Sequence, residues 1–187
     1  MREDLASHHE MSHERLIPAR PELVWRALTE LRLTDMPFAR ALFWLRRLPA
    51  YLRGRRFGSV RTPLLDGVRR ARSASVLTYD EPNLVEIGRI ARFWQTIPTN
   101  GPLVGDRAEF AAFVEPGYAK AVVSIRLIPK DSGTLVVTTT RISATDEKAR
   151  RRFAAYWRVI RIGSGATRKA MLSAAERRAL ALMAEGA

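Results

Sequence analysis

The chain contains no cysteine among its 187 residues. This absence excludes a disulfide framework, a thiolate nucleophile and any metal site with cysteine ligands. Long apolar runs are absent as well, since no stretch approaches the ~18 residues that a membrane-spanning helix needs. The N-terminal sequence MREDLASHHEMSHERL also lacks the apolar centre of a secretion signal. We therefore expect a cytoplasmic protein that is neither secreted nor membrane-spanning.

Histidine is scarce, and His8, His9 and His13 are the only three in the chain. Residues 1–11 are polar and aperiodic, which predicts a disordered tail ahead of one domain over 12–185. A Ser-His-Asp triad or a histidine relay inside the fold is then not available. The tail has no apolar periodicity to hold its histidines on one helix face. We therefore predict no metal site and no cofactor.

The formal net charge of +13 is unevenly distributed along the chain. Residues 36–79 carry ten basic side chains and one acidic one, and residues 146–187 carry ten basic and four acidic ones. Hydrophobic residues make up 47% of the chain and charged residues 27%. This is ordinary globular usage, and the length suits one domain.

The first third of the sequence predicts a strand followed by two helices. His13 to Ala19 resembles a short strand, and Pro21 and Glu22 are typical of a helix start, which predicts a helix over 21–33. Met36 to Tyr51 has an amphipathic pattern with arginines between its apolar residues, which indicates a second helix.

The middle of the chain alternates β-prone segments with turns. The predicted strands cover 72–79, 84–94, 107–115, 119–128 and 134–143. Turn-forming residues such as Pro116-Gly117 separate them. A succession of hairpins without intervening helices favours an antiparallel sheet over a βαβ fold.

The last segment predicts a long helix that begins after Asp146, with Asp146 or Thr145 as its N-cap. Apolar residues recur near a period of 3.6 from Phe153 onward. Gly163-Ser164-Gly165 interrupts this pattern, which predicts a kink or a turn between two helices.

Three local patterns carry a resemblance to a known family: Ala19 to Trp25 after the first strand, Gly88 to Trp94 in a central strand, and Thr138 to Arg141 before the final helix with its Tyr156-Trp157 pair. With this element order, the chain resembles the START-like, or SRPBCC, superfamily, and is similar to its small bacterial polyketide-cyclase-like members of unassigned activity.

The resemblance implies an α+β helix-grip fold. A curved antiparallel sheet of about six or seven strands would wrap around the long C-terminal helix, with two shorter helices after the first strand. It also implies a hydrophobic cavity between the sheet and the last helix. The segment from Leu33 to Arg72 departs from the family pattern because it is longer and more basic.

The resemblance and the aromatic content predict binding or transport of a hydrophobic small molecule, such as a lipid, an isoprenoid or an aromatic polyketide. The residues expected to line the cavity are aromatic or polar members of the strands and the last helix. They are Trp94, Phe110, Phe113, Tyr118, Thr138, Thr140, Arg141, Phe153, Tyr156 and Trp157.

A second hypothesis is a cyclase or dehydratase in which Glu86, Arg89 or Tyr118 handles protons. Alternation along a strand places Glu86 and Arg89 on opposite faces. Glu86, Arg89 and Arg141 could instead form cross-strand ion pairs on the outside of the sheet.

The basic segment supports a third hypothesis, an adaptor without a ligand that binds an anionic surface. Its apolar and basic residues have the composition of a helix on a membrane surface, or of a lid over the cavity. The residues considered are Phe38, Phe43, Trp44, Arg46, Arg47 and Arg53. Nucleic-acid phosphates are a less favoured partner for the same arginines, and a solvated arginine-rich face needs no partner at all.

Overall fold

The computed structural model describes residues 7–52, 63, 66 and 74–185. Its centre is one open antiparallel sheet with the strand order β1-β6-β5-β3-β2, and β4 pairs with β3 beside this path. The strands are β1 (His9–Ile17), β2 (Ser75–Asp80), β3 (Leu84–Arg92), β4 (Thr99–Asn100), β5 (Ala119–Lys130) and β6 (Gly133–Ala144).

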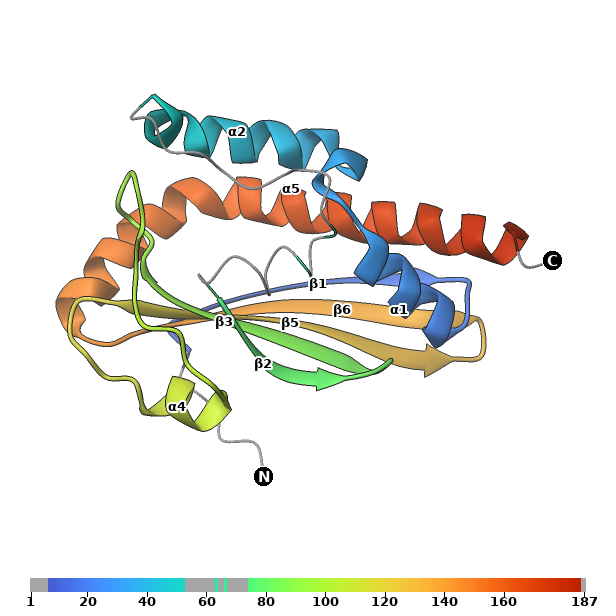
Figure 1. Ribbon diagram of the computed structural model, residues 1–187, viewed down its shortest axis with the longest axis horizontal. Helices are drawn as coiled ribbons and strands as arrows, with labels where there is room; N and C mark the ends of the chain where they lie inside the picture. Colours follow the sequence, from blue (N-terminus) through green and yellow to red (C-terminus); the bar gives the residue numbers. More distant parts are fainter. Residues whose placement is uncertain (1–6, 53–62, 64–65, 67–73, 186–187) are drawn as a thin grey trace.

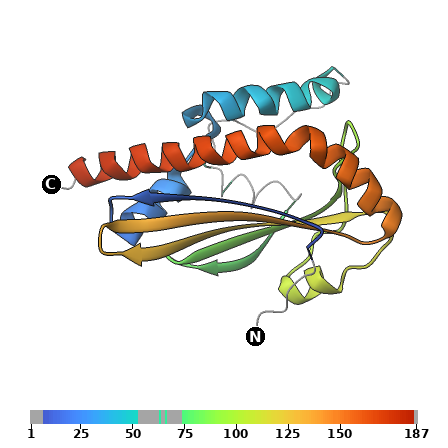
Figure 2. The same cartoon turned by 180° about the vertical axis from the view of Figure 1, so that it is seen from behind.

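Helices lie on both sides of this sheet (Figure 1). They are α1 (Pro21–Glu30), the 3-10 helix η1 (Leu33–Asp35), α2 (Pro37–Tyr51), α4 (Arg107–Ala112) and α5 (Glu147–Glu185). The long α5 crosses one side of the sheet, and α4 lies on the other side (Figures 1 and 2). This is the helix-grip arrangement that the START-like resemblance implied. None of the described helices is long and apolar enough to cross a membrane.

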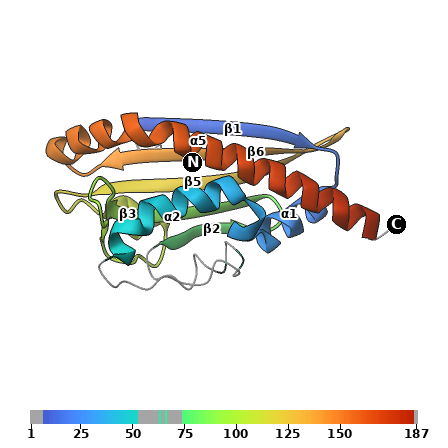
Figure 3. The ribbon, with the colours of Figure 1, turned by 90° about the horizontal axis from the view of Figure 1, so that it is seen from above.

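The first helix follows the sequence prediction closely. Pro21 occupies its first turn together with Glu22, and Val24, Trp25 and Ala27 are buried against the sheet and α5. The predicted second helix is confirmed as α2, which lies beside α5 (Figure 3). Residues 53–62, 64–65 and 67–73 of the basic segment lie outside the described residues.

Helix α5 begins where the sequence predicted. Asp146 caps it, because its carboxylate accepts a hydrogen bond from the Ala149 amide at 2.8 Å and another from the Gly117 amide. These backbone hydrogen bonds hold the pKa of Asp146 below its usual value. The helix bends in its first half (Figure 1) but continues through the predicted interruption without a turn.

The two glycines of that interruption allow close packing on opposite sides of α5. A Cβ atom on Gly163 would lie 3.4 Å from Leu42 of α2, and one on Gly165 would lie 3.3 Å from Nε2 of His13 in β1. Of the two alternatives predicted here, a kink or a turn, the turn is wrong because α5 continues through both glycines, and contacts with neighbouring elements explain them.

The first strand begins earlier than the sequence indicated. Strand β1 starts at His9 and pairs with β6 from His9 to Ile17. The predicted tail over 1–11 is therefore wrong for residues 9–11, and residues 1–6 lie outside the described part. His9 therefore belongs to the sheet together with His13, which the sequence had already placed at the start of this strand.

The predicted strand over 107–115 is also wrong, because α4 occupies its first part. Asp106 caps this helix by accepting a hydrogen bond from the Glu109 amide at 2.8 Å. The Glu109 carboxylate reaches back to the Gly105 amide at 2.6 Å. An Asp followed three residues later by Glu is the capping-box pattern that marks a helix start.

Candidate ligand-binding site

We call the side of the sheet that α5 covers the inner face and the side that carries α4 the outer face. Directly paired residues of antiparallel strands project to the same side. One row of paired residues across the sheet consists of His13, Thr138, Ile125 and Val85. Arg168 of α5 donates a hydrogen bond to the Thr138 hydroxyl, which places this row on the inner face.

Two apolar clusters fill the ends of the inner face. The first lies against α1 and the later part of α5 and includes Leu127, Val136 and Leu172. The second surrounds Phe153 near the start of α5 and includes Ala119 and Ile142. These clusters anchor α5 at both ends of the sheet.

The inner face between the two clusters is polar. It contains the buried side chains of Thr138 and Thr140, which are 1% and 7% exposed. His13 from β1 and Arg168 from α5 approach the same place. We call these four residues the polar layer.

Arg168 is a partly buried cation without a counter-charge among the described residues. Its Nη1 donates to Oγ1 of Thr138 at 3.0 Å, and the described residues give it no ion pair. Burial lowers the pKa of Arg168 from its usual value to about 10. The sequence from 148 to 175 contains no acidic residue, so α5 itself supplies no partner over this stretch.

His13 also has unused hydrogen-bonding capacity. Its Nδ1 atom is buried and has no hydrogen-bond partner among the described residues. Burial and the charges of Lys169 and Arg168 lower the pKa of His13, which favours the neutral ring. Gly165 lets this ring lie directly against α5.

The side chains next to the polar layer are incompletely covered. Ile87, Val123 and Ile125 point inward from the central strands β3 and β5, yet each remains partly exposed. By contrast, Val136 in the first apolar cluster is fully buried. Helix α5 therefore covers the middle of the inner face less completely than the end that holds the first apolar cluster.

An aromatic group borders the polar layer on the side of the second cluster. The Phe153 ring lies 5.6 Å from His9 and 5.9 Å from Trp157, measured between ring centroids. Trp94 and Tyr156 pack against the same cluster. Five of the ten predicted ligand residues, Thr138, Thr140, Phe153, Tyr156 and Trp157, thus come from β6 and α5 around the inner face, and Trp94 joins them.

The other predicted ligand residues do not join this group. Phe110, Phe113 and Tyr118 form a separate cluster with α4 on the outer face. Arg141 also points outward and forms an exposed ion pair with Glu10 at 3.3 Å. The ten predicted residues therefore do not form one group, because the segment around Phe110 is a helix on the far side of the sheet.

The three predicted catalytic residues are divided in the same way. Glu86 lies on the outer face, where it accepts hydrogen bonds from Arg107 and from Thr78 at 2.8 Å. Tyr118 is also on the outer side, whereas Arg89 pairs with Ala121 on the inner face and bonds Asn100 at 2.7 Å. The predicted separation of Glu86 and Arg89 is confirmed, and the structure does not bring the three together.

A cavity of about 30 Å³ adjoins Glu86, Arg107 and Lys120 on the outer face. This volume is enough for about one or two water molecules and too small for an organic ligand. Lys120 is buried here and donates to the carbonyls of Phe110 and Ala111, which attaches α4 to β5. Burial lowers the pKa of Lys120. These polar groups fasten α4 to the sheet.

A larger open groove of about 810 Å³ lies between the end of α1, η1 and α5. Arg178 pairs there with Glu30 at 2.8 Å and with Glu185 at 3.1 Å. Arg177 donates to the Asp35 carbonyl and has no ion pair among the described residues. The charge of Arg178 is therefore neutralised within the chain.

The outward side of α2 carries exposed apolar side chains. Phe38, Leu45, Leu48 and Leu52 recur three to seven residues apart, and Leu45 is 68% exposed. Trp44 is half exposed and contacts the Tyr51 ring. The side chains of Phe43, Arg46 and Arg47, and the whole of Arg53, lie outside the described residues.

The sequence prediction missed His13 and Arg168. The alternation of His9, Met11 and His13 was a strand signal, but its inward positions are mostly polar, so no apolar pattern revealed it. Arg168 belongs to a helix rich in exposed arginines, and its sequence neighbours give no indication that it alone turns inward.

No protein-family model matches the chain, and no curated protein matches it. Among solved structures, protein MLL2253 from Mesorhizobium loti matches 90% of this chain and 98% of its own, at 16% identity and a TM-score of 0.41. CalU16 from Micromonospora echinospora matches 94% of this chain and 86% of its own, at 14% identity and a TM-score of 0.31. The Zhui aromatase/cyclase from Streptomyces sp. R1128 matches 91% of this chain and 94% of its own, at 14% identity and a TM-score of 0.33. These likenesses assign neither an activity nor a ligand to this chain.

Proposed function

We propose that the protein binds a hydrophobic small molecule, such as a lipid, an isoprenoid or an aromatic polyketide, between α5 and the inner face of the sheet. The observation that carries this proposal is the polar layer between two apolar clusters. A ligand site of this kind combines apolar walls, which supply affinity, with a few polar groups, which fix orientation. Thr138 and Arg168 are the polar groups, and Ile87 and Val123 belong to the apolar wall.

Binding is favoured over a cyclase or dehydratase activity. A proton-transfer mechanism needs an acid or base within reach of the substrate. Glu86 and Tyr118 lie on the outer face, away from the proposed site. His13 and Arg168 can orient a ligand there, and binding requires nothing more of them.

The test is native mass spectrometry of the protein purified from its own host, followed by organic extraction and identification of any released molecule. A stoichiometric hydrophobic molecule supports the proposal. A bare protein that also fails to bind the neutral fluorescent probe N-phenyl-1-naphthylamine contradicts it.

The site can be located with a matched pair of substitutions. Val123→Phe adds volume on the inner face, where it should lower probe affinity at least several-fold. Val137→Phe makes the same change on the outer face of β6 and should leave affinity unchanged. Equal effects of the two variants would count against the inner-face site.

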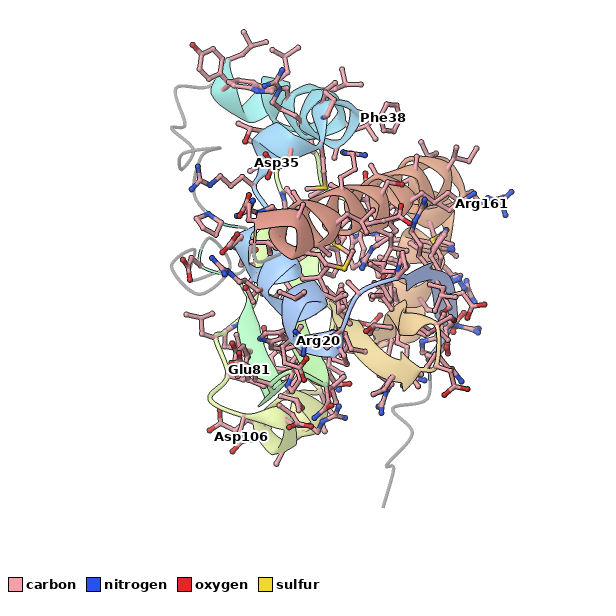
Figure 4. All side chains as sticks on the ribbon, turned by 90° about the vertical axis from the view of Figure 1, so that its right-hand side faces the viewer. Arg20, Asp35, Phe38, Glu81, Asp106 and Arg161 are labelled. Atoms are coloured by element: carbon pink, nitrogen blue, oxygen red, sulfur yellow. The ribbon has the colours of Figure 1, made fainter. Side chains whose placement is uncertain are left out.

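The exposed side of α2 supports a second function, contact with an anionic membrane surface. Val159 and Ile162 of α5 are 78% and 75% exposed, and α2 packs on the same helix. Exposed Arg158 and Arg161 alternate with them, and Phe38 and Arg161 project outward in Figure 4. Apolar side chains flanked by arginines fit a surface of anionic lipids.

Vesicle co-sedimentation tests this contact. The variant Leu45→Ser/Leu48→Ser should lose roughly ten-fold or more of its binding to phosphatidylserine vesicles, because two apolar side chains no longer enter the lipid. Val114→Ser removes an equally exposed apolar side chain elsewhere and is the control. Undiminished vesicle binding of the double variant contradicts the membrane contact. The contact is also contradicted if the two substitutions change only the self-association of the protein and not its vesicle binding.

A further inference from the structure

The polar layer indicates which chemical class of ligand the site takes, and this step rests on the proposed function. Arg168 has five N–H donors, and Thr138 accepts from one of them. A buried cation is stabilised by an opposite charge, and the described residues provide none. An anionic ligand would supply the counter-charge that the described residues lack.

The surroundings of Arg168 also favour an anion. Lys169 is its neighbour, and both positive charges act on His13. No acidic residue occurs from 148 to 175. A site surrounded by charges of one sign attracts a ligand of the opposite sign.

Further hydrogen-bonding groups are available at the same place. Because the Thr138 oxygen accepts from Arg168, its own hydroxyl hydrogen is free to point at a ligand oxygen. The Nδ1 atom of His13 is buried without a hydrogen-bond partner in the described part of the chain, and it can donate in the appropriate tautomer. The three side chains come from α5, β6 and β1, so the fold itself assembles the group.

The apolar residues continue away from this group along the inner face. Ile125 follows Thr138 in the same row, and Val123 and Ile87 belong to the next row. All three remain partly exposed. A molecule with an acid at one end and an apolar body fits this arrangement of a charged end and an apolar floor.

We propose that the ligand is an amphipathic organic acid whose carboxylate or phosphate group is bound by Arg168 and Thr138, with His13 beside it, while its apolar part lies along Ile87 and Val123.

Matched ligands test this proposal by displacement of N-phenyl-1-naphthylamine. Dodecanoate, dodecyl phosphate and 1-dodecanol share one alkyl chain and differ in the head group. A hydrogen bond with a charged group contributes about 1.5–3 kcal/mol, so at least one acid should bind roughly ten-fold or more tightly than the alcohol. The stronger of the two acids distinguishes a carboxylate site from a phosphate site.

The variant Arg168→Gln should abolish this preference, so that the two acids and 1-dodecanol bind with similar affinities. Arg168→Lys retains the charge and should restore part of the preference. The control Arg126→Gln removes an exposed arginine from the outer face of β5 and should bind like the wild-type protein.

Three results overturn the acid proposal while ligand binding itself stands. The first two, both in a protein that binds the probe, are an equal affinity for alcohol and acids and the failure of all three compounds to displace the probe. The third is an acid preference that survives in Arg168→Gln with circular dichroism like that of the wild-type protein. Failure of the wild-type protein to bind the probe would overturn the proposed function and the acid proposal with it.

Discussion

Replacing Arg168 with methionine should leave the protein as stable as before or make it more stable. Burial lowers the pKa of Arg168 to about 10, which means that it disfavours the charged form by roughly 3 kcal/mol relative to the unfolded chain. This cost is present at neutral pH and disappears only as the pH rises through the folded and then the unfolded pKa. The hydrogen bond with Thr138 offsets about 1.5–3 kcal/mol of it.

Arg168→Met removes both the cost and the hydrogen bond, and methionine fills much of the same volume. We therefore expect the free energy of unfolding to stay constant or to rise by about 1 kcal/mol. Urea denaturation followed by tryptophan fluorescence measures this difference. The control is Arg178→Met, which breaks the ion pairs with Glu30 and Glu185 and should lower stability by up to about 1 kcal/mol.

A loss of about 2 kcal/mol or more in Arg168→Met would refute the reasoning, because it would show that Arg168 stabilises the empty protein. The combination of retained stability and lost acid binding is what distinguishes a binding residue from a structural one.

Three further predictions concern packing, the outer face and pH. Gly163→Ala should stabilise α5 by about 0.5–1 kcal/mol in thermal unfolding, whereas Gly165→Ala should gain less because its Cβ would press on the His13 ring; equal gains would contradict the close contact. Glu86→Gln should weaken the attachment of α4, seen as faster amide exchange there, with unchanged probe binding; lost binding would contradict its outer-face position. Because the pKa values of His9 and His13 are lowered in the folded protein, the unfolded chain binds protons more readily than the folded one. The free energy of unfolding should therefore fall as the pH drops below about 6.5. A free energy of unfolding that stays constant from pH 7 to 5 would contradict this.

Local signals in the sequence were sufficient for most of the fold. Pro21 and Glu22 marked the start of α1, and the cap at Asp146 marked the start of α5, because these signals act within one helical turn. Turn residues separated the strands of the central hairpins correctly. The resemblance to the START-like family then supplied the way in which the helix and the sheet combine.

The errors occurred where a local pattern had two structural solutions. Phe110 and Phe113 are three residues apart, which suits one side of a helix, and the alternating residues around them also suit a strand. The inward positions of β1 are polar at His9 and His13, so the usual apolar alternation of a strand was missing. In both places tertiary contacts determined the outcome, with α4 held by Lys120 and β1 paired along its whole length with β6.

The candidate site was only partly predictable for a similar reason. The aromatic residues of α5 were found because large apolar side chains in an amphipathic helix point toward the interior. Arg168 was not found, because its burial depends on the angle at which α5 crosses the sheet. The separation of Glu86 from the inner face followed from strand alternation, but only the register showed which face α5 covers.

Isoleucine methyl NMR tests the central claim most directly, because isoleucines on both faces of the sheet report on ligand position. Spectra of protein labelled at the isoleucine δ1 methyl groups are recorded during titration with N-phenyl-1-naphthylamine. If the ligand lies between α5 and the sheet, the signals of Ile87 and Ile125 on the inner face should shift, while those of Ile90 and Ile128 on the outer face stay in place. Shifts confined to Ile90 and Ile128, or no shift at saturating probe, would contradict the proposed ligand site.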